Sequence, residues 1–395
     1  MVLHVSVRDL LKTMKAVCSV IQPKAPLPIL GDVLFTQKDG VFMLTASSPE
    51  HSLTMPVGIT IEAGNAFCEF CLDPKTVIPF LQSLPEQPLT MEVDLQTKIA
   101  KLIHNSGHVT VPTDNAAEYP RIVFNGEPTS QYTIDTKIFL PAIAAALPNT
   151  ADDALRPVMN TVCLDINAEG ITFVATDGQT LYKYMWYVGA GFLSQPRGEA
   201  QSGFSEQTLI PKEVVRAIAV PFANSEQITV TRNVNHVALS SGDICFTIRH
   251  MEGRYPNYNA VIPQNQPYHI LLPVRQLANA LNRVSLMSDS GSQLVILEKT
   301  DLFMNISSKD MQFNRSGSEE LVLATDDQGT SLPDACTLPS GFKIGFKASG
   351  MLKLLDNIST DNVRLELSEP SRALLLKEDA PNSTLTELLM PMTIQ

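Results

Sequence analysis

Lysines and arginines at helical spacing are the residues of this chain whose types and positions most readily suggest chemistry. Arg8, Lys12 and Lys15 stand at positions i, i+4 and i+7 of one segment, so they share a face if that segment is a helix. Asp9 is the only acid in the stretch. Cations on one helix face can contact phosphate groups, whereas a solvated surface is the plainer interpretation for a single helix.

The same bias appears in all six segments whose apolar spacing predicts a helix. The chain carries 41 acids and 29 basic residues, yet these segments contain few acids, mainly Asp9, Glu213 and Asp356. Their basic residues are Arg8, Lys12, Lys15, Lys75, Lys137, Lys212, Arg216, Arg275, Arg283 and Lys353. A bias repeated over six helices predicts one continuous positive surface that faces a polyanion.

The overall charge has the opposite sign. The net charge is −12 and the pI is about 5.1, whereas proteins that grip phosphates are normally basic as a whole. Binding depends on where the charge lies rather than on its average. An acidic body with a positive inner surface satisfies both observations.

Patterns that would indicate catalysis, a metal or a cofactor are incomplete. Cys68 and Cys71 form a C-x-x-C, but a zinc site needs a second pair, and a redox motif would open a helix rather than lie on a predicted strand. Asp177, next to a glycine, is typical of a turn. The sequence has no G-x-S-x-G, P-loop or G-x-G-x-x-G. We therefore expect no enzyme, no metal site and no cofactor.

Composition bounds the class of protein. An apolar content of 44% and a charged content of 18% are those of a soluble globular protein. Apolar runs are too short to span a membrane, and the first residues do not resemble a signal peptide. Six cysteines without regular spacing are typical of a reducing compartment. These features predict a cytoplasmic protein without a membrane partner.

The chain also repeats itself. Tyr119-Pro120 recurs as Tyr255-Pro256, and Lys75 has counterparts at Lys212 and Lys347, so a unit of roughly 130 residues, which is the size of a domain, fits three times into 395 residues. The pattern within each unit is strand, helix and three strands, and this pattern occurs twice. We expect an α+β fold with three similar domains, at 1–129, 130–265 and 266–395.

The predicted helices follow from apolar residues at helical spacing. They cover about 8–21, 74–84, 137–147, 212–222, 274–287 and 348–358. Pro141 and Pro221 are expected to kink or end their helices. A strand is expected at 65–72 and a Gly/Ser/Gln-rich loop at 189–205.

With this organisation, the whole chain resembles the bacterial replication sliding clamp, the beta subunit of DNA polymerase III. The stretches that carry the resemblance are 27–31 (LPILG), 175–178 (ATDG), 252–258 (EGRYPNY) and 390–392 (MPM). The resemblance implies that each domain packs two helices against two antiparallel sheets. It also implies that two chains close head to tail into a ring around duplex DNA, with the helices lining the hole. Such a ring tethers the replicative DNA polymerase.

DNA contacts in such a ring should be made to phosphates, because a sliding protein must not read sequence. The resemblance adds two positions to the basic residues of the helices, Lys24 at the inner rim and Arg156 beside the hole. Arg156 is followed here by Pro157 and Val158, where the family often has aromatic residues.

The resemblance further implies a pocket between the second and third domains, in which the polymerase, the clamp loader and repair proteins insert short linear motifs. The matching residues are Met159, Thr176, Gly178, Gln179, Thr180, Leu181, Pro256, Val261, Leu388, Met390, Pro391 and Met392. An apolar, Met-rich site adapts to varied partners. Gln179, Thr180 and Ala260 stand where many relatives have basic residues, so we expect a less positive pocket. Leu181, Val261 and Leu388 can also be read as ordinary core residues.

A ring needs closing surfaces, and apolar residues at domain edges are the candidates. Val109 and Val111 alternate on a predicted edge strand, and Leu286 and Met287 end a predicted helix. These four residues form the predicted homodimer interface; the alternative is that they cap the cores of their own domains. For function, the alternative to a clamp is a non-catalytic protein-interaction scaffold of the same fold.

Overall fold

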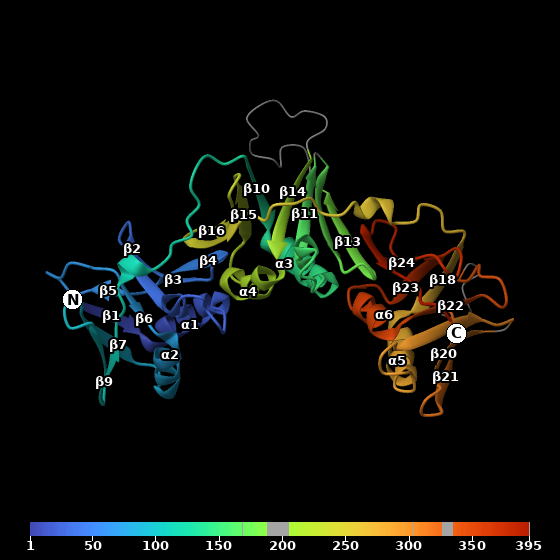
Figure 1. The fold of residues 1–395 in the computed structure, drawn as a ribbon, viewed down its shortest axis with the longest axis horizontal. Helices are drawn as coiled ribbons and strands as arrows, with labels where there is room; N and C mark the ends of the chain where they lie inside the picture. The colour runs from blue at the N-terminus through green and yellow to red at the C-terminus, as the bar shows by residue number, and fades with distance from the viewer. Residues whose placement is uncertain (168, 188–204, 302, 326–334, 395) are drawn as a thin grey trace. The chain divides into compact units, whose positions relative to one another are not determined.

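The structure is a computed structural model that describes residues 1–167, 169–187, 205–301, 303–325 and 335–394 (Figure 1). The chain forms two compact units. The described residues of the first lie in Met1–Pro141 and Ile210–Glu252, and those of the second lie in Ala142–Gly189, Gly203–Leu209 and Gly253–Gln395. The division into three domains at 129/130 and 265/266 remains a prediction. The predicted loop at 189–205 lies outside the described residues, except for Ser205.

The six predicted helices are all present. They are α1 (Val7–Val17), α2 (Pro74–Ser83), α3 (Thr136–Ala146), α4 (Lys212–Phe222), α5 (Val274–Ser285) and α6 (Ala348–Leu355). α3 continues past Pro141 to Ala146, so this proline does not end its helix, whereas α4 ends at Phe222, one residue after Pro221. A proline removes only one backbone hydrogen bond, and Pro221 does so in the last turn, where little helix remains to be disrupted.

The ends of α1 show why this segment is helical. The Ser6 side chain caps the helix by accepting a hydrogen bond from the Asp9 amide at 3.0 Å. Asp9 lies in the first turn and Lys15 in the last, which suits the helix dipole. Leu10 and Met14 are fully buried along the opposite stripe. The apolar stripe therefore points inward, and the lysines point to solvent.

The first unit contains two antiparallel sheets. One has the order β5 (Thr60–Ile61), β1 (Val2–Ser6), β7 (Pro88–Asp94), β8 (Ile99–His104) and β9 (Gly107–Pro112). The other has the order β6 (Phe70–Leu72), β2 (Val33–Lys38), β3 (Val41–Ser47), β4 (His51–Val57), β17 (Ile244–Arg249), β16 (His236–Ser241), β15 (Gln227–Arg232) and β10 (Ser130–Asp135). The strand expected at 65–72 is confirmed only for β6.

The second unit also contains two antiparallel sheets. The larger has the order β14 (Ser205–Pro211), β11 (Thr161–Asn167), β12 (Gly170–Thr176), β13 (Thr180–Tyr187), β25 (Leu385–Leu389), β24 (Leu374–Glu378), β23 (Asn362–Leu367) and β18 (Tyr268–Pro273). The smaller has the order β21 (Arg315–Leu321), β20 (Met304–Asp310), β19 (Leu294–Lys299) and β22 (Lys343–Lys347).

The two eight-stranded sheets share one plan. In the first unit β4 pairs with β17, and in the second β13 pairs with β25. Each pairing joins the strands of one sequence repeat to those of the next. A short 3-10 turn precedes the first long strand in both cases, at Pro28–Gly31 before β2 and at Pro157–Asn160 before β11. The repeat seen in the sequence is therefore a repeat of sheet architecture.

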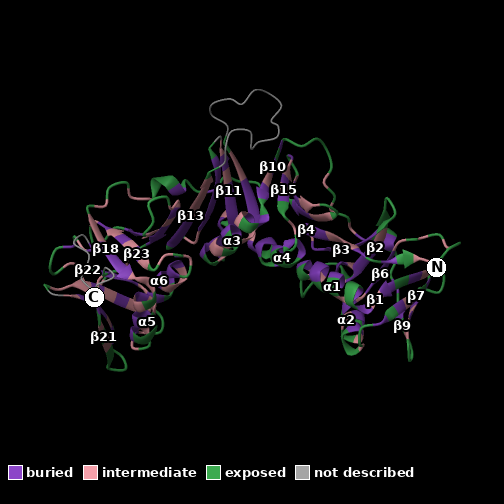
Figure 2. Cartoon of the chain, turned by 180° about the vertical axis from the view of Figure 1, so that it is seen from behind, coloured by how far each residue is buried: buried purple, intermediate pink, exposed green. Residues whose placement is uncertain are grey.

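The helices pack against these sheets and form the cores. α1 contacts β3, β4 and α2, whereas α5 contacts β20, β21 and α6. Buried residues gather on the helices and strands, and exposed residues gather in the connecting loops (Figure 2). Phe35 stacks on Phe70, with 4.6 Å between ring centroids, where β2 pairs with β6. The α+β fold expected from the sequence is confirmed.

Candidate functional site

The exposed faces of the helices carry most of the predicted DNA-facing residues. Arg8, Lys12 and Lys15 are exposed on α1, opposite the buried Leu10 and Met14. α1 contacts both α2 and α4 within the first unit. The basic residues of these three helices therefore belong to one packed group.

Many of these cations are available for a new partner. Among the described residues, several exposed basic side chains have no hydrogen bond or ion pair to another side chain. They are Lys12, Lys15, Lys24, Lys75, Lys137, Arg216 and Arg275. An exposed cation without an internal partner can exchange its hydration and counterions for a phosphate.

The other predicted cations have partners or are buried. Arg8 lies 3.7 Å from Glu86, and Arg156 lies 2.8 Å from Asp153. Arg283 makes two hydrogen bonds of 2.7 Å to Glu319. Exposed pairs of this kind contribute little and rearrange readily.

Lys212 and Lys353 differ from these exposed residues. Lys212 is only 8% exposed. The Lys353 side chain is 20% exposed, and its ammonium lies 3.0 Å from an Asp177 carboxylate oxygen. Both are therefore left out of the contact set proposed below.

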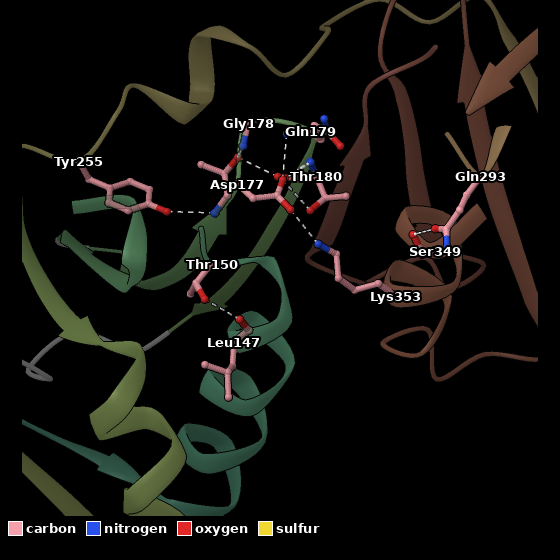
Figure 3. A network of polar contacts seen from close by, with 11 residues as sticks. Leu147, Thr150, Asp177, Gly178, Gln179, Thr180, Tyr255, Gln293, Ser349 and Lys353 are labelled. Carbon is pink, nitrogen blue, oxygen red and sulfur yellow. Dashed lines mark hydrogen bonds and ion pairs between the residues drawn. The ribbon is translucent and has the colours of Figure 1, made fainter. Parts of the chain in front are cut away.

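Asp177 organises the turn between β12 and β13 (Figure 3). One carboxylate oxygen accepts hydrogen bonds from the amides of Gln179 at 2.9 Å and Thr180 at 2.7 Å. The other oxygen faces Lys353 of α6. Gly178 has φ +87°, a conformation that favours glycine. The turn predicted from Asp177 is confirmed, and its link to α6 is an additional feature.

The electrostatics of Asp177 follow from this arrangement. Burial alone would raise its pKa, but the Thr180 amide and the Lys353 ammonium stabilise the ionised form, and the pKa lies below its ordinary value. A depressed folded-state pKa contributes stability at neutral pH, which is lost as the pH falls through that pKa. The Asp177–Lys353 pair thus fastens the β12–β13 turn to α6 under physiological conditions.

Thr176 and Tyr255 complete the polar frame. The Tyr255 hydroxyl accepts a hydrogen bond from the Thr176 amide at 3.0 Å, and the Thr176 hydroxyl donates to the Thr180 carbonyl at 2.7 Å. Gly178 donates its amide to the Thr176 hydroxyl at 3.1 Å. The structure therefore brings together the predicted pocket residues Thr176, Gly178, Gln179 and Thr180. The sequence repeat points to Tyr255 as the counterpart of Tyr119. It does not predict that the Tyr255 hydroxyl bonds to Thr176.

The C-terminal segment runs beside this frame. β25 pairs with β13, with Leu388 opposite Leu181, and the Met390 amide donates to the Gln179 carbonyl at 2.8 Å. The Met392 amide donates to the Gly345 carbonyl at 2.7 Å. The chain end at Met390–Met392 is therefore held against both β13 and β22.

Exposure separates the predicted pocket residues into two groups. Met159, Leu181 and Leu388 are at most 4% exposed and therefore act as core residues. Val261 is 57% exposed and Met390 42%, and Pro256 and Gln179 are also exposed. The exposed residues can contact a partner directly, whereas the buried residues cannot.

A basic residue lies close to this group. The Lys183 ammonium donates to the Asn259 side chain at 3.0 Å and lies 5.6 Å from the centroid of the Tyr258 ring. Burial lowers the pKa of Lys183. Gln179 and Ala260 contribute no charge of their own, and Lys183 is the one basic residue of β13.

Glu387 of β25 is an ionisable group that the sequence analysis does not single out. It is fully buried, and one of its oxygens accepts a hydrogen bond from the Asn357 amide at 2.7 Å. The other oxygen has no partner among the described residues. Burial raises the pKa of Glu387 well above its usual range, so the folded state holds the carboxyl as the neutral acid.

This burial predicts a specific pH dependence of stability. Above the unfolded-state pKa the unfolded chain releases the Glu387 proton and the folded chain keeps it, so stability falls as the pH rises towards the raised pKa. The slope for one proton is about 1.4 kcal/mol per pH unit. We expect Glu387→Gln to remove this component in urea unfolding measured from pH 5 to 8. Glu320→Gln, at an exposed position, is the control. Equal slopes for wild type and Glu387→Gln would contradict the prediction.

The predicted dimer residues lie at two sheet edges. β9 is an edge strand in the first unit, where Val109 is half-buried and Val111 is 6% exposed. β21 is an edge strand in the second unit, and Leu286 follows α5, which packs against β21. Leu286 is 69% exposed and Met287 is half-buried. Val111 therefore fits a core position, whereas Leu286 is open to a partner.

Other sequence signals remain without a site. Cys71 is buried in β6 and Cys68 is exposed, and no cluster of three metal-ligating residues occurs in the described part of the chain. His104 and His108 have the i, i+4 spacing of a helical metal pair, but they lie on the two strands of the β8–β9 hairpin. No helix among the described residues is long and apolar enough to cross a membrane.

Comparison with known proteins gives a consistent result. Residues 1–123 match the family model of the DNA polymerase III beta subunit, N-terminal domain, and residues 259–393 match that of its C-terminal domain. The beta sliding clamps of Pseudomonas aeruginosa and Escherichia coli K12 are each 23% identical, and in both cases the match covers 98% of this chain and 98% of the relative.

A solved structure agrees in fold. The sliding clamp of Pseudomonas aeruginosa bound to griselimycin superposes with a TM-score of 0.84 at 21% identity, covering 99% of this chain and all of that one. The two family models describe opposite ends of one subunit and occur here in the same order. This chain therefore belongs to the family of the bacterial DNA polymerase III beta subunit, the sliding clamp.

Proposed function

We propose that this chain is a processivity clamp that encircles duplex DNA and tethers the replicative DNA polymerase. The observation that carries the proposal is the set of exposed lysines and arginines on the helices, most of which have no side-chain partner among the described residues, in a chain whose net charge is −12. A local cationic surface on an acidic body suits a protein that must contact phosphates without adhering tightly. Such contacts carry no sequence information, which sliding requires. The chain acts as an accessory subunit and catalyses no reaction itself.

The proposed DNA-contacting set contains the exposed cations. It comprises Arg8, Lys12, Lys15, Lys24, Lys75, Lys137, Arg156, Arg216, Arg275 and Arg283. The paired members, Arg8, Arg156 and Arg283, would exchange an exposed carboxylate for a phosphate, at little cost in stability.

Encirclement requires a second copy of the chain. We place the closing contacts at the edge strands β9 and β21, because unpaired edges are templates for strand addition between chains. Leu286 supplies exposed apolar surface beside β21. The proposed assembly is a head-to-tail homodimer, in which β9 of one copy meets β21 of the other.

The dimer is tested by a single substitution. Leu286→Asp places a charge on exposed apolar surface, so the monomer should fold normally while self-association weakens by about 100-fold or more, the scale of a disrupted interface anchor. Sedimentation equilibrium at micromolar concentration measures the change. Val234→Asp, at a position 78% exposed in the turn between β15 and β16, should leave the dimer intact. A Leu286→Asp protein that dimerises like wild type would remove this residue from the interface.

Partners are proposed to dock beside the C-terminal segment. Val261, Met390, Pro391 and Met392 supply adaptable apolar surface, and the Asp177 turn holds β13 in place beneath them. We propose that the replicative polymerase, the clamp loader and repair proteins insert short linear motifs here. All six cysteines are unpaired, which suits the proposed cytoplasmic location.

Retention on circular DNA tests the function. We expect the loaded protein to stay on closed circular DNA in salt that removes electrostatically bound proteins, and to leave once the circle is cut. Loss at the same salt concentration from intact and cut circles would indicate ordinary binding, as would be expected of a scaffold that does not enclose DNA.

A further inference from the structure

A hollow lies in the first unit, among residues that the sequence analysis does not single out as a binding site. Its volume is about 360 Å³, which is within the range of small-ligand pockets. Four segments line it: 26–30 before β2, the 48–50 turn between β3 and β4, residues 120–122, and Arg249 at the end of β17. Pro26, Leu27, Pro120 and Ile122 give much of the lining an apolar character.

This hollow occupies the repeat-equivalent position of the proposed partner pocket. The Arg249 amide donates to the Glu50 carbonyl at 2.8 Å, as the Met390 amide donates to the Gln179 carbonyl at 2.8 Å. Both bonds extend the one strand pairing that joins two repeats, β4–β17 in the first unit and β13–β25 in the second. Arg249 thus stands where Met390 stands, and Glu50 where Gln179 stands.

The turns that border the two sites are built alike. Ser48 accepts a hydrogen bond on its side-chain oxygen from the His51 amide at 3.2 Å, as Asp177 does from the Thr180 amide at 2.7 Å. Leu30 of the Pro28–Gly31 turn is buried, with 2% of its surface exposed. Met159 of the Pro157–Asn160 turn is likewise buried, with 4% exposed. The same framework therefore supports both sites, and the differences between them lie in the side chains that reach the surface.

Those differences concern charge. Met390 is replaced by Arg249, whose exposed side chain makes no hydrogen bond or ion pair with a described residue. Arg121 also lines the hollow and is paired with Glu69, which is not part of the lining. Glu50 is the one acid in the lining. This hollow thus offers a guanidinium that has no partner among the described residues, where the proposed partner pocket offers a thioether.

We propose that this hollow is a second docking site, which binds an extended segment of a partner protein in which a large apolar side chain adjoins a carboxylate. The inference rests on the proposed peptide-binding role of the repeat-equivalent pocket. The apolar side chain would lie against Leu27, which is 51% exposed, and Ile122. The carboxylate would pair with the Arg249 guanidinium, whose planar donor groups suit two parallel hydrogen bonds. One ring could then hold two kinds of partner, distinguished by the charge of their motifs.

The probe is the acetylated, amidated tetrapeptide Asp-Leu-Leu-Asp, compared with Lys-Leu-Leu-Lys of the same length and apolar content. Methyl NMR of the full-length chain labelled at leucine and isoleucine reports both sites separately: Leu27, Leu30 and Ile122 for the hollow, and Leu388 for the partner pocket. We expect the acidic peptide to shift the Leu27 and Ile122 methyl signals in a saturable manner. The basic peptide should leave them unchanged at the same concentrations.

Substitutions at exposed positions assign the binding. Arg249→Glu should weaken the acidic peptide about tenfold or more, corresponding to about 1.4 kcal/mol. Glu50→Gln should leave the affinity unchanged or increase it. Lys38→Glu makes the same charge change at an exposed position of β2, beside the β2–β3 turn, and should have no effect. Leu27→Ala tests the apolar half and should also weaken binding.

The outcomes separate this inference from the proposed function. Equal effects of Arg249→Glu and Lys38→Glu, equal binding of the two peptides, or shifts that never saturate would overturn the second site. Shifts of the Leu388 signals without shifts at Leu27 and Ile122 would also overturn the second site. They would leave the proposed partner pocket unchallenged. Saturable shifts at Leu27 and Ile122 that Arg249→Glu abolishes would support the second site, whatever happens at Leu388.

Discussion

The triple variant Arg8→Glu, Lys12→Glu and Lys15→Glu is expected to lose its hold on DNA. All three side chains are exposed on α1, so the substitutions reverse the charge of one helix face without entering the core. Each lost phosphate contact should reduce the slope of log K against log salt by about 0.9, and the reversed charges add repulsion. Less of the variant than of wild type should therefore be loaded onto closed circles, although the molecules that do enclose a circle should still resist salt. Bead-bound DNA circles eluted along a salt gradient provide the measurement.

A matched control separates this local effect from total charge. Lys38, Lys98 and Lys309 are exposed and lie outside the helices, so their triple replacement by glutamate changes the net charge equally. We expect this control to retain DNA nearly as well as wild type. Equal retention by the α1 variant and wild type would instead favour the protein-interaction scaffold.

Met390→Asp is expected to disconnect the clamp from its polymerase. Met390 is 42% exposed, and its backbone is fixed by a hydrogen bond to Gln179, so a carboxylate there would meet the apolar anchor of an incoming motif. An unpaired charge at the centre of a docking site should weaken binding by at least about 2 kcal/mol, or roughly 30-fold. Primer extension by the cognate replicative polymerase should yield short products, while the variant still loads onto circles.

The control for this variant is Met311→Asp, at a side chain 79% exposed in the turn between β20 and β21. It should support long extension products. Both variants should unfold within about 0.5 kcal/mol of wild type, because neither replaces a core residue. Long products with Met390→Asp would show that partners do not use the C-terminal segment.

Local pattern was sufficient to predict the helices and much of their exposure. The i, i+4, i+7 spacing placed Arg8, Lys12 and Lys15 on one exposed face, because an α-helix fixes that geometry within four residues of sequence. The same reasoning predicted the buried stripe through Leu10 and Met14. The repeated Tyr-Pro pair also indicated a duplicated architecture, which the two eight-stranded sheets display.

Tertiary contacts were not accessible in this way. Lys353 lies on a predicted helix, like most of the predicted DNA-facing residues. Its ammonium is nevertheless paired with the carboxylate of Asp177, which is 176 residues away in the sequence. Lys212 begins α4 but is covered by neighbouring segments. The sequence of β21, RSGSEEL, alternates too little between apolar and polar residues to predict a strand. Its backbone pairing with β20 is what makes this segment a strand.

The pocket shows the same division. Family resemblance indicated these residues, but only the structure shows that Leu181 and Leu388 pair in the core, whereas Met390 and Val261 are exposed. Exposure therefore separates the buried members of the predicted set from those that a partner could contact.

The most direct test of the proposed function measures how long the loaded protein remains on one DNA circle before and after a single cut. In high salt, enclosure predicts a long residence on the intact circle, rapid loss after cutting, and recovery of residence when the cut ends are blocked by bulky protein. Only a topological link depends on DNA ends in this way, because electrostatic binding depends on phosphates that the cut leaves unchanged. Equal residence times on intact, cut and end-blocked DNA would contradict the proposal that this chain encircles DNA.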